Sequence, residues 1–209
     1  MNVQPNRRLR TTAAISAITA IAFLLQDFAG PHVILQAGFI PVRLTAAYPF
    51  TAVPFALTPL TATLLHGGWA HLGFNLLMLI YCGRQVESVL GGMRLLILYV
   101  LGAYGAALGQ YLYDPGSSAP MIGASGAISA VIGTYALMFG RNQVKRIGPV
   151  PALAVRALWL AAAWLVLQWG VGFISGGTGT PIAVAAHVGG FLTGLVLMYP
   201  LLEWRYRYG

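Results

Sequence analysis

Ser125 and His187 are the two residues of this sequence whose chemistry is most readily turned into a reaction, because each lies in a long apolar run. A serine hydroxyl becomes an effective nucleophile when a base takes its proton, and a neutral histidine is the usual base. Burial favours the neutral imidazole, which is the form that can accept that proton. Attack on an amide would create an oxyanion, for which Asn75, His71 and the backbone N–H of Ser125 are candidate donors.

The residues around Ser125 indicate which class of hydrolase the sequence could encode. Gly123 and Gly126 flank Ser125 and would let another backbone come close. The run does not follow a strand and does not match the Gly-x-Ser-x-Gly elbow of soluble hydrolases. No carboxylate is placed to orient His187, so we expect a serine–histidine dyad. The sequence has no His-Glu-x-x-His motif and a single cysteine, Cys82, so we expect neither a metal ion nor a cofactor.

The composition of the chain places these polar groups in a membrane. Of its 209 residues, 58% are hydrophobic and only 8% are charged, whereas about a quarter of a soluble domain is charged. The net charge of +8 sits mostly in short segments between apolar runs. This placement is typical of cytoplasmic loops, so we expect a lipid bilayer as the partner and no nucleic acid. We predict an all-α, polytopic membrane helix bundle forming a single domain over residues 1–209.

Apolar stretches long enough to cross a bilayer recur along the chain, at about 20 residues each. We interpret the first as a retained span rather than a signal peptide. A further apolar segment, residues 30–66, contains prolines 31, 41, 49, 54 and 59. That proline density excludes one straight helix and predicts a loop associated with the outer interface. The six predicted transmembrane helices are 11–29, 67–83, 94–113, 121–140, 151–173 and 181–202.

The distribution of arginine and lysine predicts the orientation. If both termini are cytoplasmic, Arg43 is the only one of the 12 basic residues that falls outside. Basic residues concentrate in cytoplasmic segments, so we predict an N-in, C-in topology.

This topology predicts that the polar groups meet at one depth. At a rise of 1.5 Å per residue, Ser125 would lie roughly 6 Å and His187 roughly 9 Å below the outer ends of their spans. His71 and Asn75 are four residues apart, on one face of the first turns of the second span. Small residues at helical spacing predict close contacts among the third, fourth and sixth spans; they are Gly102, Gly105, Gly109, Gly126, Ala130, Gly133, Gly190 and Gly194.

Four separated motifs resemble those of the rhomboid intramembrane serine proteases, in the same order along the chain. They are His66-Gly-Gly-Trp-Ala-His71-Leu-Gly-Phe-Asn75, Glu87-Ser-Val-Leu-Gly91-Gly-Met-Arg94, Gly123-Ala-Ser125-Gly126 and Ala186-His187-Val-Gly189-Gly190-Phe-Leu-Thr-Gly194. The resemblance extends from about Leu57 to Gly194. It implies Ser125 as nucleophile, His187 as base, and Asn75 and His71 as support for the oxyanion.

The resemblance also implies structural roles. His66 would help to hold the outer loop, and Glu87 would pin the inner loops. Many family members carry an aromatic residue one turn after the serine, stacked on the base. This sequence has Ser129 there, which leaves open what positions His187. The Trp-Arg pair common in the first outer loop of the family is absent from that loop here.

The family resemblance implies an intramembrane serine endopeptidase of a bacterial-type inner (plasma) membrane. It would cleave single-span membrane proteins near the outer face through an acyl-enzyme. Two other hypotheses are a catalytically inactive relative that binds membrane helices and a small transporter. Retention of both Ser125 and His187 argues against the first, and the apolar inner halves of the spans argue against the second. The sequence leaves the physiological substrate, the cleavage-site preference and the oligomeric state open.

Overall fold

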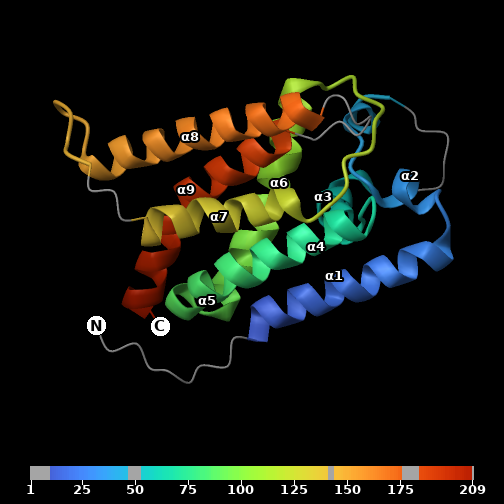
Figure 1. Cartoon of the computed structure of the whole chain (residues 1–209), viewed down its shortest axis with the longest axis horizontal. Helices are drawn as coiled ribbons and strands as arrows, with labels where there is room; N and C mark the ends of the chain where they lie inside the picture. The colour runs from blue at the N-terminus through green and yellow to red at the C-terminus, as the bar shows by residue number, and fades with distance from the viewer. Residues whose placement is uncertain (1–9, 47–52, 141–143, 176–183, 209) are drawn as a thin grey trace.

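A computed structural model of the chain describes residues 10–46, 53–140, 144–175 and 184–208, and within them every regular element is a helix (Figure 1). Two isolated β-bridges, Phe39–Met121 and Ile147–Val150, complete the regular pairing in these ranges. The long helices are α1 (Arg10–Ala29), α6 (Gly92–Tyr113), α7 (Ser125–Phe139), α8 (Ala152–Ser175) and α9 (Val184–Tyr208). A further helix runs from α4 (Trp69–Met78) through the π-helical turn η4 (Leu79–Gly83) into α5 (Arg84–Leu90).

Three of these helices, α1, α6 and α9, are long and apolar enough to cross a membrane. The predicted all-α fold is therefore confirmed, whereas the six crossings and the N-in, C-in topology stay predictions. Helix α7 has 15 residues, which corresponds to a rise of only about 22 Å.

Glycine and alanine form the contacts at the centre of the bundle, where α6, α7 and α9 meet. A Cβ atom added to Gly102 of α6 would lie 2.6 Å from the Cβ of Ala130 on α7. One added to Gly133 of α7 would lie 2.6 Å from the carbonyl oxygen of Phe191 on α9. These approaches are too close for any larger residue, so the small-residue contacts predicted from the sequence are confirmed.

Large apolar side chains lie on the outside of this bundle. Phe74, Leu112 and Val196 are each 71% exposed, on α4, α6 and α9. A protein in water buries such side chains, but in a bilayer they contact lipid tails. The small-inside, large-outside arrangement is that of an integral membrane protein.

The segment between α1 and α4 is broken into short turns, as its prolines predicted. Its described part contains α2 (Val33–Ala37), η1 (Pro41–Leu44), η2 (Phe55–Leu57), α3 (Thr58–Thr61) and η3 (Ala62–Leu64). The backbone of this segment meets the residues just before α7. The N–H of Phe39 donates to the carbonyl of Met121, and the N–H of Gly123 donates to the carbonyl of Ala62, at 3.0 and 2.9 Å. The loop thereby fixes the approach to Ser125.

Helix α1 is fastened near both of its ends. Near the first end, the carboxylate of Glu87 accepts the backbone N–H groups of Thr11 and Thr12, each at 2.9 Å, and the Thr12 hydroxyl at 2.6 Å. Near the other end, the amide of Gln26 brackets the backbone of His66, donating to its carbonyl at 2.8 Å and accepting its N–H at 2.9 Å. The start of a helix has N–H groups without helical partners, and a carboxylate satisfies them well.

Three predicted boundaries differ from the structure by four residues or more, and the predicted start of the last span at residue 181 lies outside the described residues. The fourth helix begins at Ser125 and not at residue 121, and the second continues past residue 83 to Leu90. The last helix continues past residue 202 to Tyr208, with Pro200 inside it. The predicted spans were drawn from the length of each apolar run. A helix can continue into polar residues beyond that run, as the second and last helices do.

Candidate active site

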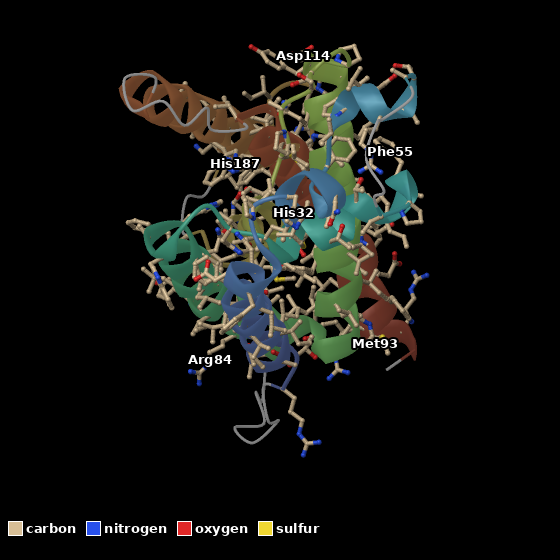
Figure 2. All side chains as sticks on the ribbon, turned by 90° about the vertical axis from the view of Figure 1, so that its right-hand side faces the viewer. His32, Phe55, Arg84, Met93, Asp114 and His187 are labelled. Atoms are coloured by element: carbon tan, nitrogen blue, oxygen red, sulfur yellow. The ribbon has the colours of Figure 1, made fainter. Side chains whose placement is uncertain are left out.

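Ser125 and His187 come together inside the bundle. The Nε2 atom of His187 lies 2.8 Å from the Oγ atom of Ser125, across 62 residues of sequence. His187 is in the first described turn of α9 and Ser125 is the first residue of α7. In Figure 2, His187 lies nearer to Asp114 than to Arg84 and Met93, which mark the opposite end of the molecule. The geometry allows proton transfer from the hydroxyl to the imidazole.

The position of Ser125 at the start of α7 corrects the expectation that it lies about one turn inside its helix. Residues 121–124 are not helical. Because the first N–H groups of a helix have no partner within it, the backbone N–H of Ser125 is free of the helical ladder. This position strengthens its candidacy as a donor to an oxyanion.

His71 faces the same point as Ser125. A Cβ atom added to Gly123 would lie 2.6 Å from Nε2 of His71 and 3.6 Å from Oγ of Ser125. The other ring nitrogen, Nδ1, accepts the backbone N–H of Gly67 at 3.3 Å. A neutral imidazole that accepts at Nδ1 carries its proton on Nε2, so His71 presents an N–H donor toward the serine. Gly123 has a φ of 110°, and a larger residue there would be strained and would collide with this imidazole.

Asn75 lies one turn further along α4 and is only 5% exposed. Its Nδ2 donates to the carbonyl oxygen of His71 at 3.0 Å. A carboxamide has two N–H groups, so this bond leaves a second donor for a ligand. Asn75 therefore both steadies the turn that carries His71 and can itself donate.

One cavity connects these groups, with a volume of about 2430 Å³. It is lined by α4, α6, α7, α8 and α9 and takes in the four polar side chains together with Gly123 and Gly126. Most of its lining is apolar, as suits a membrane peptide segment. The described residues contain no group of three or more His, Cys, Asp or Glu side chains that could hold a metal ion.

Trp164 of α8 contacts the turn of α9 that begins with His187. Its indole N–H donates to the carbonyl oxygen of His187 at 3.4 Å. Its ring stacks on Phe191, with the centroids 4.9 Å apart and the planes at 9°. This residue could not be predicted from the sequence, because a tryptophan in an apolar span carries no signal of which residues it contacts.

Ser129 occupies the place where the resemblance led us to expect an aromatic residue. Its hydroxyl donates to the carbonyl of Ser125 at 2.8 Å, and its side chain is buried. A Cβ atom on Gly190 would lie 3.3 Å from the Cβ of Ser129 and would collide with the carbonyl oxygen of Gly126. A small residue at 129 thus suits the close packing of α7 on α9, which holds His187 beside Ser125 together with Trp164.

The remaining predicted residues surround this centre. A Cβ atom on Gly126 would meet that of Ala106 at 2.5 Å, so this glycine brings α6 and α7 together. The ring of His66 is buried outside the cavity lining and packs 5.0 Å from the ring of His71, while Gln26 holds its backbone. Glu87 is buried far along the same helical segment, where its partners lie at the start of α1 rather than in the inner loops. Gln26, a polar amide in the first span, was also missed from the sequence.

A membrane helix bundle that encloses a serine and a histidine within hydrogen-bonding distance is typical of intramembrane serine hydrolases. Residues 56–204 match the family model described as the Rhomboid domain. The chain belongs to the rhomboid family.

Curated relatives agree with this assignment. Rhomboid-related protein 2 of Mus musculus is 30% identical over 143 residues, covering 67% of this chain and 46% of the relative. RHOMBOID-like protein 5 of Arabidopsis thaliana is 33% identical over 145 residues, covering 69% and 43%. Rhomboid protease GlpG of Yersinia pestis is 33% identical over 137 residues, covering 65% and 44%. The matched region thus spans less than half the length of these relatives.

Proposed function

We propose that this protein is an intramembrane serine endopeptidase that cleaves single-span membrane proteins near the outer face of the bilayer. The observation that carries the proposal is the 2.8 Å approach of His187 Nε2 to Ser125 Oγ, within a cavity that also contains His71 and Asn75. The name of the Yersinia relative, a rhomboid protease, supports the same class of reaction.

The proposed reaction begins when Nε2 of His187 takes the hydroxyl proton of Ser125. The serine oxygen then attacks the scissile carbonyl, whose oxygen becomes an oxyanion stabilised by the N–H of Ser125, His71 Nε2–H and the Asn75 amide. His187 next gives its proton to the leaving amine as the peptide C–N bond breaks, which leaves an acyl ester on Ser125. A water molecule deprotonated by His187 hydrolyses that ester and restores both residues.

The proposed setting is a bacterial-type inner membrane, with six spans and both termini in the cytoplasm. Asp114 ends α6 at the end of the molecule opposite Arg84 (Figure 2). Reporter fusions after Asp114 should lie outside the cytoplasm, and fusions after Lys145 inside. The reverse pattern would contradict the placement of the site near the outer face.

The test of activity is cleavage of a single-span membrane protein by the detergent-purified protein, with Ser125→Ala as the matched control. The wild type should release a fragment and react with a fluorophosphonate probe, and Ser125→Ala should do neither. If the two forms label equally, Ser125 is not the nucleophile. If the folded wild type neither cleaves nor labels, the proposed activity is wrong and the hypothesis of a catalytically inactive relative is favoured.

A further inference from the structure

Two arginines converge at the end of the bundle away from the serine. If Gly91 carried a Cβ atom, it would lie 3.7 Å from Nη1 of Arg205 and 4.0 Å from Nη1 of Arg94. Gly91 precedes α6 and has a φ of 83°, so no side chain occupies this space. Figure 2 places Met93, next to Arg94 in sequence, at the same end as Arg84.

Arg94 is held in position from one side. Its Nη2 donates to the carbonyl oxygen of Trp204 at 3.1 Å, and its guanidinium carbon lies 4.6 Å from the centroid of the Trp204 ring. Its Nε atom is buried and makes no hydrogen bond with the described residues. The guanidinium is therefore pre-oriented, and its Nη1 atom lies 4.0 Å from the position that a Cβ atom of Gly91 would take.

No carboxylate forms an ion pair with either arginine within the described part of the chain, although the Oε1 atom of Glu87 would lie 3.3 Å from a Cβ atom on the neighbouring Gly92. Of the four acidic residues in the sequence, Glu203 pairs with Arg207 at 2.8 Å and Glu87 binds the start of α1. The other two, Asp27 and Asp114, lie near the opposite ends of α1 and α6. Two like charges at close range repel each other unless an anion lies between them.

We propose that Arg94 and Arg205 bind the phosphate group of an anionic phospholipid at Gly91. Guanidinium groups match phosphate oxygens in charge and in their forked geometry. A lipid is the source that fits the surroundings, because Trp204 and Tyr206 are 41% and 63% exposed beside the pair. Such aromatic residues gather at the headgroup level of membranes. The proposal does not depend on the catalytic function.

Native mass spectrometry of the detergent-purified protein tests this site with phosphatidylglycerol, phosphatidylcholine and inorganic phosphate as probes. The wild type should retain phosphatidylglycerol in preference to phosphatidylcholine. Arg205→Gln should lower the apparent affinity for phosphatidylglycerol by about tenfold or more, because a charge-assisted contact is lost. Among the described residues Arg205 makes no hydrogen bond, so this variant should fold even if Arg94→Gln does not.

Arg207→Gln is the matched control, because Arg207 lies two residues after Arg205 on the same helix. Its side chain is 67% exposed and already pairs with Glu203. It should keep the wild-type preference. Equal losses in the two variants would overturn the site in favour of a general charge effect, as would equal retention of both lipids. Inorganic phosphate should bind only weakly; if it binds as tightly as phosphatidylglycerol, the lipid assignment is wrong.

Discussion

The Nε2 atom of His187 and the Oγ atom of Ser125 lie 2.8 Å apart although the two residues belong to different helices. Close backbone contacts between α7 and α9, at Gly126 and Gly190, maintain this approach. The pair should therefore behave as one chemical unit.

The first prediction is that the losses of activity caused by Ser125→Ala and by His187→Ala do not multiply when the two substitutions are combined. Removal of either residue abolishes the covalent route, so Ser125→Ala/His187→Ala should be no slower than either single variant. Cleavage rates of the three variants, measured beside thermal unfolding in detergent, provide the check. Losses that add in free energy would instead indicate independent structural roles.

The second prediction concerns the oxyanion donors on α4. His71→Ala and Asn75→Ala should each lower kcat by roughly 100- to 1000-fold, which corresponds to about 2.7–4 kcal/mol for one lost donor. Steady-state kinetics on a single-span substrate measure the effect. Because Asn75 also bonds to the carbonyl of His71, unfolding curves must accompany its kinetics. Full activity in both variants would leave backbone groups as the sole support of the oxyanion.

The third prediction is that Trp164 positions His187. Trp164→Phe keeps an aromatic ring for stacking on Phe191 but loses the N–H that reaches the His187 carbonyl. The loss of a neutral hydrogen bond should lower kcat by about two- to tenfold and slow fluorophosphonate labelling in parallel, with KM nearly unchanged. Trp159→Phe is the control, because Trp159 lies on the same helix and is 66% exposed. A role in packing alone would lower the unfolding temperature without slowing the labelling of folded protein.

The fourth prediction separates stability from activity through Glu87. Glu87→Gln replaces a carboxylate that accepts three hydrogen bonds from Thr11 and Thr12. The free energy of unfolding should fall by about 1.5–3 kcal/mol, as for hydrogen bonds to a charged group. Glu203→Gln, which breaks an exposed ion pair, should change it by less than about 1 kcal/mol. Both variants should cleave normally per folded molecule, and a selective loss of turnover in Glu87→Gln would contradict the structural role.

The sequence predicted which residues form the candidate site better than it predicted where they lie within their helices. Ser125 and His187 could be paired from it because polar groups are rare in apolar spans and the basic residues indicate which spans run in the same direction. The start of α7 at Ser125 was missed, since residues 121–124 are apolar and match lipid whether helical or extended. Likewise α9 continues through Pro200, because a membrane helix tolerates proline when neighbouring groups satisfy the freed carbonyl.

The contacts that Trp164 and Gln26 make with other segments could not be predicted from the sequence. Trp164 and Gln26 act on backbone atoms of His187 and His66, and a backbone acceptor has no signature in the residue types. The small residue at 129 could be noticed in the sequence, but its significance depends on how closely Gly190 approaches.

Helix α1 is hydrogen-bonded to Glu87 through Thr12 and to His66 through Gln26, so it holds the two ends of the segment between His66 and Glu87 at a fixed separation. About 21 Å of helix separate the two attachment points, and a slip of one residue along or around α1 would break both. When the bilayer thins or thickens, a helix answers the mismatch by tilting. Because α1 is attached at His66 and at Glu87, we expect it to tilt together with α4 and α5, so that the distance between His66 and Glu87 changes little with the thickness of the surrounding lipid.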